Sequence, residues 1–399
     1  MRKIQPIIFG THEKETIAQL KNCMGTGNVV GAVLCADGHF GYSQPVGGVI
    51  AYDGQISPSG VGYDIACGNK AVKTNLSFKD IKKDLPKIMD EIQRQVPFGI
   101  GKKSQKNKNH PIFDDSEWDV YRSLGTHEHD DLKSTAREQL GTTGSGNHYV
   151  DLLIDKQTDD VWIGNHFGSR GFGHKTATGF LNLAKNRAFL DQPPHENMEQ
   201  PPTLLDLDSE LGEMYFRAMQ LAGKYAYAGR DIVIDQVLNI LQAKSTFEVH
   251  NHHNYAWKEV HNGREIVVVR KGATPAAPGQ LGFVGGSMGD ISVILQGVES
   301  KKSEEALYST VHGSGRIMSR TKAAGRMNWR TRRRSGGEIT HERMQQAIDK
   351  YGVELRGGGT DESPFVYRKL REVLDAHAGT IEVLHELKPI GVVMAGEGR

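Results

Sequence analysis

The chain has 399 residues, and its 49 Lys and Arg against 48 Asp and Glu give a net charge of +1, which excludes a protein that coats nucleic acid by bulk positive charge. Hydrophobic residues make up 37% and charged residues 24%, which is typical of a globular chain and excludes a disordered one. Three cysteines, Cys23, Cys35 and Cys67, are too few for a disulfide framework. With no signal-peptide pattern and no apolar run near the ~18 residues of a membrane span, they predict a cytoplasmic protein.

The N-terminal half is predicted to contain short strands followed by helices. Residues 26–75 carry β-branched residues between glycines, the pattern of short strands and tight turns. Residues 78–96 are predicted to form two helices, with Pro86 as the first residue of the second. Residues 101–111 are predicted to be a polar loop, and the proline-rich residues 192–202 an exposed loop.

The C-terminal half mixes the two kinds of element. Residues 209–240 predict one or two long helices, because apolar residues recur there at helical spacing. Residues 265–270 and 291–297 are predicted strands. Residues 364–379 are predicted to form one helix, and residues 390–396 a short closing strand.

Glycine is enriched, with 47 residues, and no repeat accounts for the excess. The glycines must therefore lie in many separate tight turns. Strands and helices intermix without a regular βαβ rhythm, and no segment is a convincing boundary. We expect one large α+β domain spanning residues 1–399.

Histidines concentrate in glycine-flanked segments beside other candidate metal ligands. Imidazole, thiolate and carboxylate are the ligand types for Mn, Fe, Co or Zn, and turns between strands hold such groups on a fixed backbone. The four segments are GVGYDIACG (60–68), GSGNHYVD (144–151), GNHFGSRGFGH (164–174) and VHNHHNYAWKEVH (249–261). Together they favour a metal site.

Each segment alone has a simpler structural interpretation. The Asp-x-x-Cys turn could be a capped turn beside a buried thiol, and the Asn-His turn could hold an ordinary histidine. The histidines of residues 249–261 could form a surface tract. Strand alternation places His250 and His252 on one face and His253 on the other, so only part of that cluster can reach one ion.

Three glycine-rich turns could cradle phosphate groups, since each offers free backbone N–H groups and two also carry arginine. They are GSRGFG (168–173), GGSMGD (285–290) and HGSGR (312–316). None is a Walker loop or a dinucleotide fingerprint, and an ordinary turn is the alternative for each.

A run of eight basic residues extends from Arg316 to Arg334 without an acidic residue, and Trp329 lies inside it. A charge run is usually a solvated surface. Because this one begins at the glycine-rich turn that carries His312, we favour a path that guides a polyanion into a site.

These motifs, in this order, resemble the RtcB family of RNA ligases. The resemblance spans nearly the whole chain, and it implies a compact α+β domain with stacked sheets around the site. It is carried by CADGHFGYSQPVGGVIA (35–51), GVGYDIACG (60–68), QLGTTGSGNHYVD (139–151), HFGSRGFGH (166–174), HNYAWKEVH (253–261), RKGATPA (270–276), GGSMGD (285–290), HGSGRIMSR (312–320) and KPIGVV (388–393).

The resemblance also implies which residues would act, with GTP and two Mn²⁺ ions as cofactors. His312 would be the nucleophile that takes GMP. The implied metal ligands are Asp64, Cys67, His148, His166 and His253, with Cys67 bridging the two ions. The implied GTP contacts are Asn147, Asp151, His253, Asn254, Gly285, Gly286, Ser287, Met288, Ser292, His312, Gly313, Ser314, Gly315 and Tyr367. The implied RNA contacts are Arg170, Arg316 and Arg320.

The implied activity joins an RNA 3′-phosphate or 2′,3′-cyclic phosphate to a 5′-hydroxyl, in tRNA splicing or RNA repair. The partners would be such RNA ends, GTP and an accessory activating or repair-pathway protein, with no membrane. Two other hypotheses stay open: a metal-dependent phosphodiesterase that opens cyclic phosphates without ligation, and a non-catalytic RNA-binding protein.

Two positions depart from the family pattern. Met394 stands where the family often has a lysine that contacts guanine, and Gly229–Arg230 stands in place of an Asn-Arg pair. The first departure predicts weaker selection of GTP over ATP, because methionine can pack against a purine but cannot donate a charged hydrogen bond to it.

Overall fold

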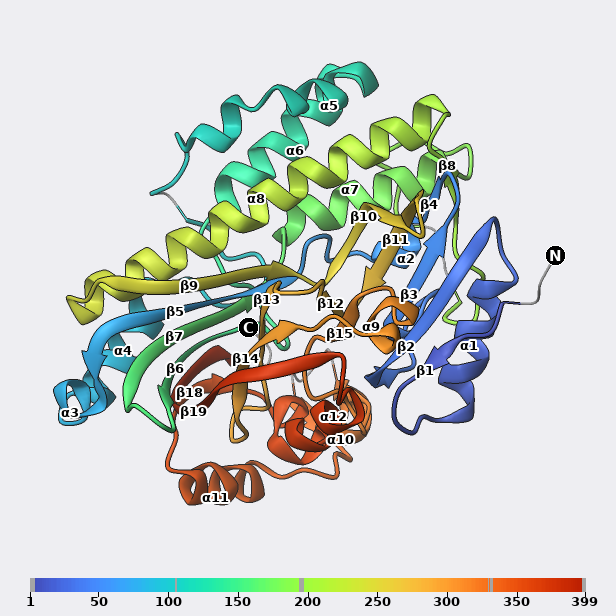
Figure 1. Ribbon diagram of the computed structural model, residues 1–399. Helices are drawn as coiled ribbons and strands as arrows, with labels where there is room; N and C mark the ends of the chain where they lie inside the picture. The colour runs from blue at the N-terminus through green and yellow to red at the C-terminus, as the bar shows by residue number, and fades with distance from the viewer. Residues whose placement is uncertain (1–3, 105, 194–196, 329, 331–332, 397–399) are drawn as a thin grey trace.

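The computed structural model describes residues 4–104, 106–193, 197–328, 330 and 333–396. Two sheets form its centre, and the helices lie around them (Figure 1). This arrangement confirms the expected α+β class. No helix within the described ranges is long and apolar enough to cross a membrane.

The larger sheet has eight strands, seven of them in the order β13-β14-β19-β6-β7-β5-β9, with β18 pairing alongside β19. All its pairs are antiparallel except β18 with β19. The strands are β5 (Gly68–Ser77), β6 (Tyr149–Asp155), β7 (Asp160–Phe167), β9 (Ser245–His252), β13 (Leu281–Val284), β14 (Ser292–Gly297), β18 (Glu354–Gly358) and β19 (Ile381–Gly396).

The smaller sheet has five strands in the order β1-β2-β3-β11-β10, and three two-stranded ribbons accompany the two sheets. The sheet contains β1 (Ile7–Ile8), β2 (Val29–His39), β3 (Val46–Tyr52), β10 (Asn254–His261) and β11 (Arg264–Lys271). The ribbons pair β4 (Gln55–Ile56) with β8 (Leu205–Asp206), β12 (Ala273–Pro275) with β15 (Ser309–Val311), and β16 (Arg326–Asn328) with β17 (Arg333–Ser335).

Helices α5 to α8 lie together on one side of the sheets, and α10 to α12 lie on the opposite side (Figure 1). The α-helices are α1 (Lys14–Met24), α2 (Pro58–Val61), α3 (Phe78–Ile81), α4 (Leu85–Gln95), α5 (Asp119–Leu124), α6 (Thr126–Gln139), α7 (Arg170–Leu183), α8 (Glu210–Leu241), α9 (Lys301–Glu305), α10 (Arg320–Ala324), α11 (His341–Tyr351) and α12 (Leu370–Ala376). Four short 3₁₀ helices are η1 (Pro111–Asp114), η2 (Ser116–Trp118), η3 (Thr360–Glu362) and η4 (Pro364–Val366).

Helix α8 is a single helix of 32 residues, which decides between the one or two helices expected there. The Ser209 side chain accepts a hydrogen bond from the Gly212 N–H and so caps its first turn. Its buried face includes Tyr215, Met219, Ala222 and Ala226, spaced at three and four residues. This face packs in the largest hydrophobic cluster, between the helical layer and the smaller sheet.

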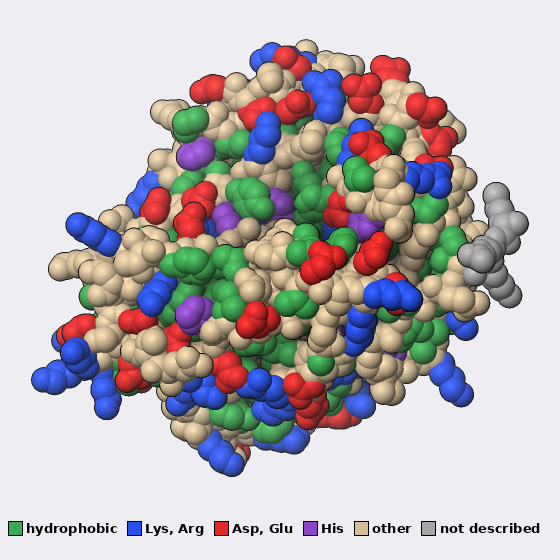
Figure 2. All heavy atoms as spheres, in the orientation of Figure 1, with side chains coloured by type: hydrophobic (Ala, Val, Ile, Leu, Met, Phe, Trp, Pro, Cys, Tyr) green, Lys and Arg blue, Asp and Glu red, His purple; other side chains and the backbone are tan. Residues whose placement is uncertain are grey.

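Further clusters separate the layers. One lies between the facing strands of the two sheets and includes Val49, Val268 and Val293. Another lies between α4, the C-terminal half of α8 and the larger sheet. On the face shown in Figure 2, positive and negative side chains are interspersed, as their nearly equal numbers lead one to expect.

The C-terminal predictions need two corrections. Residues 364–379 do not form one helix: η4 ends at Val366, Tyr367 has an extended backbone that bridges to Arg316, and α12 begins at Leu370. The predicted closing strand is the end of the 16-residue β19, which pairs with β14 and then with β6.

Two further predictions agree with the structure only in part. Pro86 is the second residue of α4, not its first. Within the predicted loop 192–202, residues 194–196 lie outside the described residues, and Pro202 is buried although most of its described neighbours are exposed.

Candidate metal and nucleotide site

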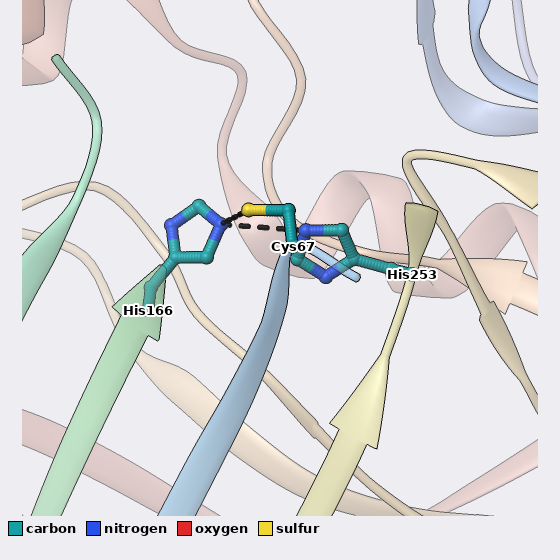
Figure 3. Close-up of side chains that lie close together, drawn as sticks. All are labelled: Cys67, His166 and His253. Atoms are coloured by element: carbon teal, nitrogen blue, oxygen red, sulfur yellow. Dashed lines mark hydrogen bonds between the residues drawn. The ribbon is translucent and has the colours of Figure 1, made fainter. Parts of the chain in front are cut away.

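Four neighbouring strands of the larger sheet bring the candidate metal ligands to one edge. Because β6, β7, β5 and β9 are antiparallel neighbours, β6 and β5 begin where β7 and β9 end. His148 directly precedes β6, His166 lies at the end of β7, Cys67 precedes β5 and His253 follows β9. Figure 3 shows Cys67, His166 and His253 converging from these strands.

The ligand atoms form two groups that share one sulfur atom. Cys67, His166 and His253 form the first, and Asp64, Cys67 and His148 the second. Cys67 Sγ lies 3.2 Å from His166 Nε2 and 3.7 Å from His148 Nε2. His166 Nε2 lies 3.3 Å from His253 Nε2, and His148 Nε2 lies 2.9 Å from Asp64 Oδ2. Ligands about 2.0–2.3 Å from a common ion are spaced about 3–4 Å apart. The distances in each group are therefore compatible with a divalent ion, and Cys67 is common to both groups.

Two of the ligand histidines, His148 and His166, have a backbone carbonyl oxygen beside Nδ1. His148 Nδ1 lies 2.9 Å from the Thr143 carbonyl oxygen, and His166 Nδ1 lies 3.1 Å from that of Asn147. A ring that donates its Nδ1–H to a carbonyl keeps an unprotonated Nε2, which is the metal-binding form. With Nδ1 as the protonated nitrogen, His148 and His166 would present Nε2 lone pairs to the thiol, and a divalent cation fits this donor set.

The electrostatics of the cluster favour a neutral Cys67 thiol and neutral imidazoles at His166 and His253. Burial, followed by the Asp64 carboxylate, raises the pKa of the Cys67 thiol well above its usual value. Burial and then neighbouring imidazoles hold the pKa values of His166 and His253 well below theirs. Burial opposes ionisation of Asp64, but the charge and hydrogen bond of His148 outweigh it and lower the pKa of Asp64 to about 2. A bound cation would favour the thiolate and the neutral imidazoles.

The rest of the histidine-rich segment serves another purpose. His250 and His252 accept hydrogen bonds from the guanidinium of Arg230, on the side away from His253. The alternation predicted for this strand is thus confirmed. His261 and Glu259 contact each other, and Glu259 pairs with Arg270.

His312 lies beside the first ligand group, with its ring centroid 4.9 Å from that of His253. Its Nδ1 is 2.6 Å from Oδ2 of the fully buried Asp37, and the backbone N–H groups of His312 and Gly313 donate to the same oxygen. Burial disfavours the Asp37 charge, but the charge and hydrogen bonds of His312 prevail and lower the pKa of that carboxyl. Gly315 has a φ of +72°, and a Cβ there would lie 2.3 Å from the Asp37 carbonyl oxygen. The turn therefore requires glycine.

A cavity of about 360 Å³, a size that suits a small ligand, lies against this cluster. Its lining contains all the predicted GTP contacts except Ser292: Asn147, Asp151, His253, Asn254, Gly285, Gly286, Ser287, Met288, His312, Gly313, Ser314, Gly315 and Tyr367. Ser292 is buried just behind, where its hydroxyl accepts from the Gly286 N–H. Met394 also lines the cavity.

Asp151 differs from the other carboxylates of the cavity. It is 5% exposed, and its Oδ1 has no hydrogen-bond partner within the described structure. Burial raises the pKa of Asp151 to about 8. An unpartnered acceptor at a cavity wall is a group that a ligand N–H could satisfy.

The three predicted RNA-binding arginines lie at or near the cavity. Arg170 begins α7, where its Nε donates to Thr142 Oγ1 and its Nη1 lies 3.4 Å from His148 Nδ1. Arg316 donates to the Tyr367 hydroxyl and the Asp361 carbonyl, and it pairs with Glu362. Arg320 pairs with Asp361 and Glu362. A phosphate would have to compete with these acids for Arg316 and Arg320.

Sequence reasoning missed the partners of the predicted residues. Asp37 was visible in the quoted CADGHFG segment, but no role was assigned to it. Tyr149, which lines the cavity, lies inside the quoted GSGNHYVD segment without an assigned role, and Glu362 lies outside every quoted motif. Of the basic run beyond Arg320, residues 329 and 331–332 lie outside the described structure, so the predicted polyanion path stays a prediction.

Comparison with known proteins gives consistent results. The family model described as tRNA-splicing ligase RtcB matches residues 19–395. The chain is 32% identical to the RNA-splicing ligase RtcB of Escherichia coli (strain K12), over 89% of this chain and 87% of that protein. It is 30% identical to the tRNA-splicing ligase RtcB of Methanococcus maripaludis, over 98% and 93% of the two chains. It is 31% identical to RNA-splicing ligase RtcB homolog 2 of Entamoeba dispar, over 96% and 84%.

Proposed function

This chain belongs to the RtcB family, and on that premise we propose that it is a GTP- and Mn²⁺-dependent RNA ligase. It joins an RNA 3′-phosphate or 2′,3′-cyclic phosphate end to a 5′-hydroxyl end through a covalent histidine–GMP intermediate. The observation that carries the proposal is the position of His312, which lies on one cavity wall beside two ligand groups that share Cys67.

His312 is the proposed nucleophile. Asp37 holds the Nδ1 side of the ring, which leaves Nε2 with a free lone pair. Nε2 attacks the α-phosphorus of GTP, the new N–P bond forms, and the bond to the pyrophosphate oxygen breaks. Asp37 keeps the tautomer fixed and stabilises the charge that develops on the ring, while the N–H groups of His312 and Gly313 hold Asp37 in place.

The metal ligands Asp64, Cys67, His148, His166 and His253 would hold two divalent ions. Such ions neutralise the triphosphate charge and act as Lewis acids toward phosphoryl oxygens. Thiolate and imidazole ligands would also accept zinc, so manganese is part of the proposal and not a consequence of the geometry.

The remaining residues position the two substrates. Asp151, Met288 and Tyr367 line the part of the cavity proposed for the purine. Arg170, Arg316 and Arg320 are proposed to bind the RNA phosphates. Arg316 and Arg320 must first separate from their carboxylate partners Glu362 and Asp361. His312 passes GMP to the RNA 3′-phosphate, and the 5′-hydroxyl then displaces GMP as the phosphodiester forms. The cytoplasmic location and an accessory protein partner stay predictions.

The test is covalent labelling by α-³²P-labelled GTP in the presence of Mn²⁺. We expect an acid-labile label on the wild-type protein and none on His312→Ala, with metal binding unchanged. His174→Ala is the control, because His174 stacks on Tyr63 outside both ligand groups. Label retained by His312→Ala would overturn the nucleophile assignment. Wild-type protein that opens cyclic phosphates but never takes label would instead support the phosphodiesterase hypothesis.

A further inference from the structure

Arg230 is a fully buried arginine in the middle of α8, beneath the metal-ligand cluster. Its guanidinium reaches four acceptors on three other segments of the chain. Nη1 donates to the carbonyl oxygens of Ala66, at 3.0 Å, and Phe167, at 2.6 Å. Nη2 lies 2.9 Å from His252 Nδ1, and Nε donates to His250 Nε2 at 2.7 Å.

Three of these four acceptors belong to residues adjacent in sequence to a metal ligand. Ala66 precedes Cys67, Phe167 follows His166, and His252 precedes His253. These neighbours lie on three separate segments, at the start of β5 and the ends of β7 and β9. One side chain therefore ties together the three backbone segments that present Cys67, His166 and His253, the ligands of Figure 3.

We propose that Arg230 is a positioning residue for the metal site: its planar guanidinium fixes the relative placement of the segments that carry Cys67, His166 and His253. This inference rests on the metal site of the proposed function. Arg230 touches no ligand atom itself and acts through the residues beside each ligand. Groups of this kind typically contribute about 10- to 100-fold to metal affinity.

Arginine suits this task better than any other residue type. It offers five N–H donors in a rigid plane, so a single side chain can satisfy acceptors in several directions at once. A lysine in the same place has one flexible ammonium and cannot reach all four acceptors with good geometry. His250 and His252 accept these bonds through unprotonated ring nitrogens, because a guanidinium can only donate.

A second buried arginine shows that Arg230 is not an ordinary core cation. Arg270 is also nearly fully buried, at 1% exposure, and it pairs with the carboxylate of Glu259 and with Ser309. Among the described residues, no carboxylate lies within ion-pair distance of Arg230. A buried cation without an anion is costly, and purely structural burial rarely keeps one.

The experiment compares Arg230→Lys with Arg270→Lys and with the wild-type protein. Each protein is titrated with Co²⁺ alone, without GTP or RNA, and the thiolate-to-cobalt absorption band is followed well below the unfolding temperature. We expect the dissociation constant of Arg230→Lys to rise at least about tenfold, with a shifted band. Arg270→Lys should keep the wild-type absorption band, and its affinity for Co²⁺ should stay within about twofold of the wild-type value. This should hold even if Arg270→Lys loses as much thermal stability as Arg230→Lys.

The outcomes separate the two levels of the proposal. If wild-type protein shows no thiolate–cobalt band, the metal site itself fails and the positioning role fails with it. If the wild type binds and Arg230→Lys binds equally well, only the positioning role is overturned. Should Arg230→Lys not fold, the wild-type protein labelled with ¹⁵N-arginine decides. A buried Nε–H exchanges slowly, and the spectrum of Arg270→Lys shows which slowly exchanging resonance does not belong to Arg270. Zn²⁺ should shift the resonance of Arg230 identified in this way, and an unchanged resonance would overturn the inference.

Discussion

The metal-ligand cluster and the pair Arg316 and Arg320, which line the same cavity, satisfy their charges in opposite ways. Cys67, His148, His166 and His253 turn their ligand atoms toward one another, and the Asp64 carboxylate joins them beside His148. Arg316 and Arg320 instead already pair with Glu362, and Arg320 also pairs with Asp361. The first cluster thus offers its ligand atoms to a cation, whereas the arginines of the second already have anionic partners.

This difference explains how one cavity could bind its components in order. Facing lone pairs and a buried thiol gain free energy when a divalent ion enters, so the ion should stabilise the fold. Paired arginines must give up carboxylates before they can hold phosphate, so RNA binding there should be weaker and more sensitive to salt. His312 lies beside His253, but its ion-pair partner is Asp37, which belongs to neither cluster.

The largest effect is expected from Cys67→Ser, which removes the atom shared by both ligand groups. At a Mn²⁺ concentration of 100 times the dissociation constant, the wild-type free energy of unfolding should rise by about 2.7 kcal/mol. The variant should show almost none of this gain, and ligation should be lost. Denaturant unfolding with and without Mn²⁺ measures it, with Cys35→Ser as the control because Cys35 is buried outside the cluster. If Mn²⁺ raised the free energy of unfolding of Cys67→Ser as much as that of the wild type, the ligand cluster would not bind its cation through Cys67.

The next effect tests the independence of His312. Asp37→Asn should keep the hydrogen bonds from the His312 and Gly313 N–H groups but lose the charge beside Nδ1. Single-turnover labelling by GTP should slow by about 100-fold or more, as loss of general acid–base support usually does. The Co²⁺ spectrum should stay unchanged. A weakened metal site in this variant would mean that His312 and the ligand cluster are coupled.

A third prediction concerns Asp151, a carboxylate that neither belongs to a metal-ligand group nor pairs with an arginine within the described structure. Because burial raises the pKa of Asp151 to about 8, the native state keeps a proton that the unfolded state loses near pH 4. Its contribution to stability is thus present below about pH 4 and declines as pH rises toward 8, by up to ~1.4 kcal/mol per unit. Asp151→Asn should remove this decline, worth up to about 2.7 kcal/mol between pH 5 and pH 7. Equal pH profiles of unfolding for variant and wild type would contradict it.

The smallest effect is expected at Met394, which lines the cavity and lies opposite Tyr149 where β19 pairs with β6. The wild-type protein should discriminate weakly against ATP, and Met394→Lys should gain about 1.5 kcal/mol of preference for GTP, the low end for a charged hydrogen bond. Competitive labelling of His312 by the two nucleotides measures it, with Met394→Leu as the apolar control. If the wild type already excludes ATP and the lysine adds nothing, other groups recognise guanine.

The sequence alone determined the local features of this protein. Glycine-bounded β-branched runs predicted the early strands, and helical spacing of apolar residues predicted α8. Period-two alternation separated His253 from His250 and His252, and motif order pointed to the family that the comparisons confirm. These features depend on neighbours in sequence or on short motifs, so they can be predicted without knowledge of the fold.

Only the tertiary structure decided which distant residues complete the site. Asp37 meets His312 across 275 positions, and Arg230 meets Ala66 across 164, so neither contact leaves a periodic signal. The predicted helix over residues 364–379 breaks because Tyr367 bridges to Arg316, a tertiary contact that outweighs local helix propensity. Hydrogen bonds and charges that stabilise a site form through space, and the sheet order β6-β7-β5-β9 that brings its ligands to one edge is set by packing of the whole chain.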